Sequence, residues 1–172
     1  MMKNLFFLFS LSIFLFIACD DDLPEPTQNG ANTFGCLING EPWTPEVDGF
    51  NEVAIDALFY LNSDGSAGLS ILSIKDVNLD DRQSMRLDFF SENFEINSKY
   101  SFTDGIEWRD DQLAGNCVRI ELDTNLHNEI YITHLNTADN IISGTFNLTY
   151  REDECDKTIE ITEGRFDVTY RQ

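Results

Sequence analysis

The stretch ISGTFNLTYR, residues 142–151, decides the fold class of this chain. Its even positions hold apolar residues and one glycine, and its odd positions hold hydroxyl, amide or guanidinium side chains. Successive side chains of a β-strand point to opposite faces, so this alternation predicts a strand with one face in a core and the other in water. Half-buried strands of this kind are typical of antiparallel sheets.

The same period of two recurs along most of the chain after residue 34, and no window shows helical spacing. The dipeptides Asn39-Gly40, Asp64-Gly65 and Asp104-Gly105 tolerate the positive φ of tight hairpin turns. About nine strands are predicted, at 34–39, 53–61, 67–75, 84–91, 99–103, 117–123, 129–136, 141–151 and 158–171. We therefore expect an all-β domain, a single antiparallel meander curled into a barrel or a two-sheet sandwich.

The last predicted strand changes phase. Ile159 and Ile161 are apolar at odd positions, whereas Phe166 and Val168 are apolar at even positions. One extra residue must be absorbed between the two pairs, and Gly164 is where a β-bulge fits. The pattern predicts that all four apolar side chains point inward.

The N-terminus has the features of a secretory signal. Lys3 precedes an apolar run at 5–17, which is followed by Ala18 and Cys19. At roughly 14 residues the run is too short to cross a bilayer, which takes about 20. The placement of Cys19 resembles the lipobox of bacterial lipoproteins, in which this thiol receives the lipid. The usual Leu three positions before the Cys is Phe16 here.

This N-terminus sets the expected domain organisation. Residues 1–18 are interpreted as the signal peptide and 34–172 as the β-rich globular domain. Between them, 19–33 contains the lipidated Cys19 and a polar, acidic segment with Pro24 and Pro26. Because this segment has no hydrophobic period, we expect a flexible tether between membrane and domain.

Charge narrows the possible partners. The 172-residue chain carries 31 acidic and 11 basic side chains, a net charge of −20. Such a surface repels the phosphates of nucleic acid and disfavours binding to anionic lipid through the globular domain. The expected membrane contact is therefore the N-terminal lipid, and the ligand or protein partner is left open.

Three cysteines remain once Cys19 is lipidated, and an odd number allows at most one internal disulfide. Cys36 shares the parity of its apolar neighbours, so we expect a buried small side chain unless the topology brings a partner beside it. Consecutive hairpins would hold Cys117 and Cys155 far beyond the roughly 7 Å between Cα atoms that a bridge tolerates. Whether Cys36 pairs with either of them stays open.

Motifs for catalysis or metal binding are missing from the sequence. His127 and His134 have no local partners for acid–base or metal chemistry. The segment 76–81 spaces oxygen side chains as calcium loops do, but Asp81 replaces the turn glycine and Leu87 stands where a bidentate Glu is needed. We therefore predict no catalytic residue, no metal, no cofactor and no enzyme activity.

The two tryptophans are the candidate ligand contacts. Trp43 and Trp108 fall in segments interpreted as loops, where an indole could stack on a sugar or line a barrel mouth. The alternative, which we favour, is that each side chain closes one end of the core.

Three segments carry a resemblance to a known group: NTFGCLING at 32–40, ISGTF at 142–146 and ITEGRFDV at 161–168. They resemble an uncharacterised, domain-of-unknown-function class of all-β lipoproteins of the Bacteroidota, although 50–116 matches poorly. The resemblance implies an all-β fold and a lineage, and it transfers no activity or catalytic residue. In the Bacteroidota a short acidic run after the lipidated Cys resembles an export signal to the outer cell surface.

Asp20, Asp21 and Asp22 directly follow Cys19 and are interpreted as that export signal. The expected location is therefore the outer membrane at the cell surface, with the periplasmic face as the alternative. The expected function is that of a membrane-anchored, non-enzymatic protein that binds or shields an unknown ligand. The alternative is a lipocalin-like or carbohydrate-binding β-barrel module.

Overall fold

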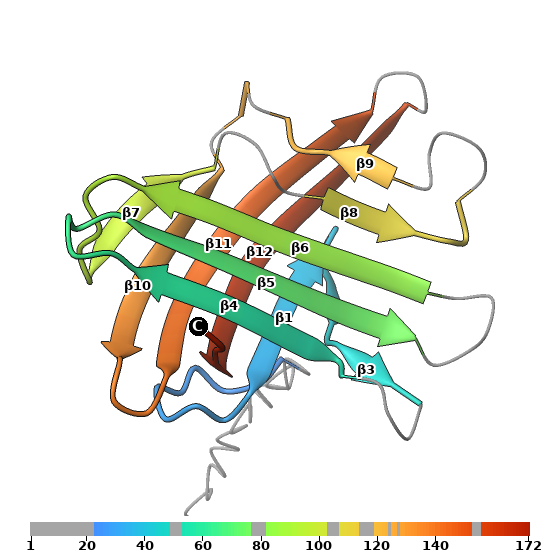
Figure 1. Ribbon diagram of the computed structural model, residues 1–172. Coiled ribbons are helices and arrows are strands. Elements are labelled where there is room, and N and C mark those ends of the chain that lie inside the picture. Colours follow the sequence, from blue (N-terminus) through green and yellow to red (C-terminus); the bar gives the residue numbers. More distant parts are fainter. Residues whose placement is uncertain are drawn as a thin grey trace, which may run out of the picture.

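The computed structural model describes residues 23–48, 53–76, 82–102, 107–113, 119–123, 125–126, 128–152 and 156–172. None of these residues is helical, and they form twelve β-strands (Figure 1). The strands are β1 (Thr33–Ile38), β2 (Glu41–Trp43), β3 (Glu46–Val47), β4 (Ile55–Leu61), β5 (Ala67–Asp76), β6 (Arg82–Ser91), β7 (Ser98–Ser101), β8 (Glu107–Asp110), β9 (Arg119–Glu121), β10 (Glu129–Asn136), β11 (Ile141–Glu152) and β12 (Lys157–Thr169).

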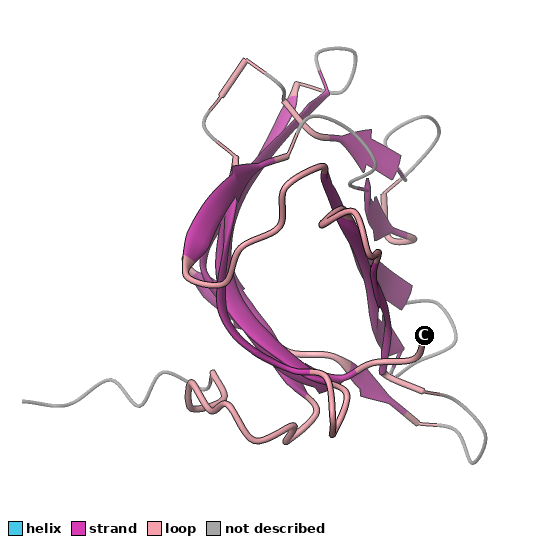
Figure 2. Cartoon of the chain, turned by 60° about the vertical axis from the view of Figure 1, so that its left-hand side comes forward, coloured by secondary structure: helices cyan, strands magenta, loops and turns pink. Residues whose placement is uncertain are grey.

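The strands form two sheets packed face to face (Figures 1 and 2). Sheet A has the order β2-β1-β12-β11-β10-β7, and sheet B has the order β3-β5-β6-β8-β9, with β4 also paired to β5. The predicted all-β class is confirmed. The sandwich alternative fits and the barrel alternative does not, because the two sheets do not close into one continuous ladder.

The prediction of one continuous meander of about nine strands is wrong. Among the described strands, only β4-β5-β6 and β10-β11-β12 are runs of three consecutive antiparallel neighbours. The pairs β1-β2 and β8-β9 are single hairpins, and β3 pairs with β5 in parallel. Along the described strands the chain passes between the sheets four times, and β1 pairs with the distant β12. A period of two identifies the buried face of a strand, but it carries no information about which strand lies beside it.

At two places an outer strand of sheet B approaches the end of a central strand of sheet A. Near the C-terminus, Phe59 N–H donates to the Arg171 carbonyl at 3.0 Å, and Arg171 N–H donates to the Ala57 carbonyl at 2.8 Å. Elsewhere, Leu122 pairs antiparallel with Tyr150. These isolated contacts join sheet B to sheet A.

The Leu122–Tyr150 pairing contradicts the consecutive hairpins from which a large separation of Cys117 and Cys155 was expected. The chain that precedes Leu122 runs toward the end of β11, not toward its start, because the pairing is antiparallel. Cys117 and Cys155 themselves lie outside the described residues.

The bulge predicted in the last strand is confirmed. Gly164 lies opposite Phe146 and Ile161 lies opposite Leu148, so β12 contains one more residue than β11 between these pairs. Glu163 lies within this bulge and has a positive φ of 52°. The four apolar side chains predicted to point inward on either side of the bulge are all buried.

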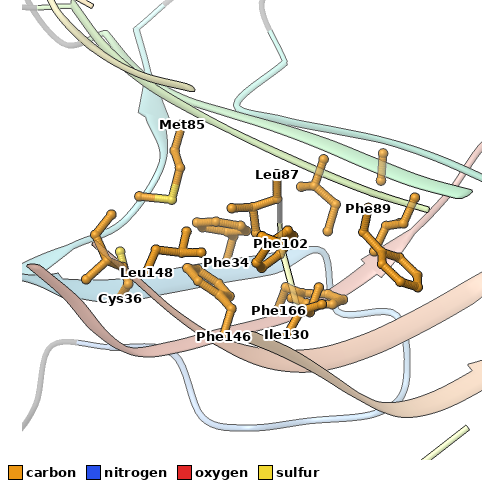
Figure 3. Packing of buried hydrophobic residues seen from close by; sticks show 14 of the residues in the cluster. Phe34, Cys36, Met85, Leu87, Phe89, Phe102, Ile130, Phe146, Leu148 and Phe166 are labelled. Carbon is orange, nitrogen blue, oxygen red and sulfur yellow. The ribbon is translucent and has the colours of Figure 1, made fainter. Parts of the chain in front are cut away.

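A hydrophobic cluster fills the space between the sheets (Figure 3). Phe34 packs against Phe146 with ring centroids 5.2 Å apart, and Phe146 packs against Phe166 at 6.5 Å. Met85, Leu87 and Phe89 of β6 face them from sheet B. The interior is therefore a packed core of the kind expected for a domain of this size.

Part of the expected flexible tether is packed on the domain. We call residues 23–32 the strap; it is the blue trace that precedes β1 in Figure 1. Leu23 is buried, and the carboxylate of Asp167, itself 1% exposed, binds the strap. Asp167 accepts hydrogen bonds from the hydroxyls of Thr27 and Ser143 and from the backbone N–H groups of Asn29, Gly30 and Ala31. The ordered domain therefore includes residues from Leu23 onward, ahead of the predicted boundary at 34.

Candidate functional site

The two tryptophans lie on strands, not in loops as the sequence suggested. Trp43 ends β2 in sheet A and Trp108 is in β8 of sheet B. Their side chains are 4% and 2% exposed, and the rings meet edge to face with centroids 5.7 Å apart. β2 and β8 have three and four residues, too few for a period of two to be recognised in the sequence.

A pocket of about 300 Å³ opens beside this tryptophan pair, and we call it the tryptophan pocket. Its volume is at the lower end of the range for small-molecule sites. Its apolar lining consists of Ile38, Pro42, Trp43, Trp108, Leu113 and Ile159. Its polar lining consists of Asn39, Glu41, Lys75, Gln83, Asp110 and Lys157.

The two indole N–H groups of the tryptophan pair differ in their hydrogen bonding. The Trp43 indole N–H donates to Gln83 Oε1 at 2.9 Å, and Gln83 Nε2 donates to Asp110 Oδ2 at 3.2 Å. The Trp108 indole Nε1 is buried and has no hydrogen-bond partner among the described residues. A buried donor left unpaired costs about 1–3 kcal/mol.

The lining of the tryptophan pocket has as many cationic as anionic side chains, whereas the chain as a whole is strongly acidic. Lys75 and Lys157 both line it, although the whole sequence contains only four lysines. Glu41 and Asp110 line it as well. The arrangement can hold a small molecule by an apolar contact with the indoles and by polar contacts with the amines, carboxylates and amide.

A larger hollow of about 930 Å³ lies where β4 approaches the C-terminus. Its prominent polar groups already bind one another: the Arg171 guanidinium pairs with Asp56, and Thr169 donates to Asn32 Oδ1 from its backbone N–H at 2.8 Å. We therefore place the candidate site at the tryptophan pocket, whose lining combines two aromatic rings with amine, carboxylate and amide side chains.

The outer face of sheet B carries an aromatic surface that the sequence analysis missed. Tyr60, Gly68 and Phe90 lie side by side on β4, β5 and β6. Tyr60 is 49% exposed and Phe90 is 61% exposed. Tyr60 covers Gly68 so closely that an added Cβ would lie 2.5 Å from its ring. The sequence signal for this surface was the presence of two adjacent aromatic pairs, Phe59-Tyr60 and Phe89-Phe90. Neighbouring residues of a strand face opposite sides, so one ring of each pair must face outward.

The remaining sequence-based sites have different outcomes. Cys19, Asp20, Asp21 and Asp22 lie outside the described residues, so the lipid attachment and export signal stay predictions. Cys36 is a free, buried cysteine, and burial raises the pKa of its thiol to about 12.

The histidine and calcium-loop predictions also have mixed outcomes. His134 shares the sequence parity of the buried Ile130 and Ile132, but a register shift after Ile132 puts it opposite Ser143, so it does not continue their core-facing row. His127 lies outside the described residues. Asp76, the first residue of the rejected calcium loop, binds Arg82 at 3.0 Å, and 77–81 are not described. Within the described ranges, no three His, Cys, Asp or Glu side chains are grouped to hold a metal ion.

No family model, curated protein or solved structure matches this chain. The resemblance to Bacteroidota lipoproteins therefore stays a prediction from sequence. Among the described residues there is no helix with the length and apolarity needed to span a bilayer.

Proposed function

We propose that this protein is an exported, non-enzymatic lipoprotein, anchored through Cys19, that binds a small amphipathic molecule in the tryptophan pocket. The observation that carries the proposal is the lining of that pocket, which joins the Trp43–Trp108 pair to the amines of Lys75 and Lys157. The lipobox-like sequence before Cys19 supports export and anchoring. The acidic run at 20–22 supports a cell-surface location, with the periplasmic face as the alternative.

The lining favours an anionic or acceptor-rich ligand over a purely apolar one. The amines of Lys75 and Lys157 are donors, Asp110 already accepts a hydrogen bond from Gln83, and the side chains of Trp43 and Trp108 supply apolar contact. A carboxylate with a short apolar body would satisfy both parts of the site. Charge-assisted hydrogen bonds of this kind are about twice as strong as neutral ones.

The test uses the two indole N–H signals of the ¹⁵N-labelled protein in detergent, since the chain contains only two tryptophans. Benzoate and indole-3-acetate serve as anionic probes, and glucose and N-acetylglucosamine serve as neutral ones. We expect a saturable shift of the Trp108 signal, assigned with Trp108→Phe, on addition of the carboxylates. If neither indole signal moves with any probe, the pocket does not bind ligands of this size.

A charge variant tests the role of the amines. Replacing Lys75 and Lys157 together with Met should weaken carboxylate binding about tenfold, equivalent to roughly 1.4 kcal/mol. Lys99→Met is the matched control, because Lys99 lies on β7 and pairs with Glu129 at 2.8 Å, away from the pocket. Equal loss in both proteins would contradict a local role for the two amines.

The aromatic surface of sheet B supports a second candidate function, carbohydrate binding. Tyr60 and Phe90 present adjacent exposed rings, an arrangement on which sugar rings can stack. A glycan array probed with the protein and with Tyr60→Ala/Phe90→Ala tests it. Signals that are retained by the double variant would exclude this surface as the glycan site.

A further inference from the structure

We propose that the strap fixes the orientation of the domain on the bilayer, with the outer face of sheet A toward the lipid and the outer face of sheet B away from it. This inference rests on the proposed lipid anchor at Cys19. It replaces the expected freely moving domain on a flexible tether with a domain held in one orientation against the lipid surface.

The strap is bound to sheet A at several points along its length. Near its start, Leu23 and Pro24 lie over Gly35 of β1, where an added Cβ would be 2.6 Å from Pro24 Cδ. In its middle, five donor groups surround Asp167, three of them backbone N–H groups of the strap. At its end, Asn32 Oδ1 accepts the Thr169 hydroxyl at 2.7 Å.

The chain between the lipid anchor and the strap is short, which limits how far the domain can lie from the bilayer. Only four residue steps separate Cys19 from the buried Leu23. Even fully extended, four steps span no more than about 14 Å, so a lipid on Cys19 keeps Leu23 within that distance of the headgroups. Because Leu23 lies on the outer side of β1, the nearest part of the domain is the outer face of sheet A.

The outer face of sheet A also tolerates a lipid surface, although the chain as a whole is strongly acidic. The outward-facing residues of central β11 from Ser143 to Thr149 are uncharged. Beside this row, Glu163 has Arg165 at 3.8 Å, and Glu129 has Lys99 at 2.8 Å. The centre of this face therefore presents uncharged side chains, and the two carboxylates beside them that form ion pairs limit repulsion by acidic headgroups.

The experiment measures which face lies near the lipid. Full-length lipidated protein is reconstituted in phosphatidylcholine vesicles that contain rhodamine-labelled phosphatidylethanolamine as energy acceptor. A donor dye is attached through p-azidophenylalanine that replaces exposed Asn147 on sheet A or, in a second protein, exposed Leu58 on sheet B. Packed sheets lie about 10 Å apart, so we expect about twofold greater transfer from position 147.

Two variants separate the strap from the anchor. A Gly/Ser insertion of about 16 residues between Asp22 and Leu23 leaves the strap intact but adds roughly 20 Å of reach. Asp167→Asn weakens the strap without changing the reach. Both should reduce the difference between the two labels, whereas Asp88→Asn, on the outer face of sheet B, should preserve it.

Equal transfer from both labels of the otherwise unmodified protein would overturn the orientation. A difference that persists after the insertion would overturn the role of the strap. Failure of the protein to float with vesicles would instead refute the lipid anchor and, with it, the proposed function on which this inference rests.

Discussion

Asp167→Asn is expected to destabilise the domain mainly by releasing the strap. The carboxylate is 1% exposed and accepts hydrogen bonds from five groups, with donor–acceptor distances from 2.7 to 3.2 Å. Asparagine keeps one acceptor oxygen and directs its own N–H groups at donors. Hydrogen bonds to a charged group contribute about 1.5–3 kcal/mol each, but release of the strap returns its donors to water and limits the total.

We therefore expect the free energy of unfolding to fall by about 3 kcal/mol, less than the separate bonds would sum to. For a chain of this size that corresponds to a melting temperature lower by roughly 6–12 °C. Urea unfolding followed by tryptophan fluorescence measures the loss. Asp88→Asn removes the same charge from an outward-facing position of β6 and is the matched control.

The pH dependence gives an independent check. Burial by itself would raise the pKa of the Asp167 carboxyl, but hydrogen bonds from Thr27, Ala31 and Ser143 lower it, and the net shift is below the ordinary value of 3.8. A carboxyl with a lowered folded-state pKa stabilises the fold above its unfolded-state pKa, and this contribution is lost as the pH falls through the folded-state pKa. The stability difference between the protein and Asp167→Asn should therefore be full at neutral pH and shrink below about pH 4.

Limited proteolysis shows whether the lost free energy of unfolding comes from release of the strap. In that case, Asp167→Asn should be cleaved within 23–32 by a protease that spares the unmodified domain. A loss below about 0.5 kcal/mol, with the strap still protected, would refute the reasoning, because surface substitutions commonly have effects of that size.

Two further predictions concern the bulge and the buried Cys36. Gly164→Ala should cost about 1–3 kcal/mol in urea unfolding, because the added Cβ would lie 2.5 Å from the Phe146 ring. An unchanged midpoint would mean that β12 shifts freely at the bulge. The Cys36 thiol, with its pKa raised to about 12 by burial, should resist iodoacetamide at pH 8 until the domain unfolds. Rapid labelling of the native protein would contradict its burial.

The sequence alone determined the all-β class, the positions of the long strands and the bulge in β12. These features depend on the order of apolar and polar residues within one strand, which is a local pattern. It identified Ile161 and Phe166 as inward-facing despite their opposite parity, because an extra residue between them is the simplest way to keep both buried.

Tertiary structure alone decided which strands are neighbours, and with them the candidate site. Trp43 and Trp108 are far apart in the sequence, and only the packing of sheet A on sheet B brings their rings to 5.7 Å. Asp167 reads as a solvated side chain of an alternating strand, yet the strap buries it and satisfies it with backbone N–H groups. Hydrophobic alternation specifies a face that must be covered, but every other apolar face can cover it equally well, so long-range pairing and buried polar contacts follow only from the complete fold.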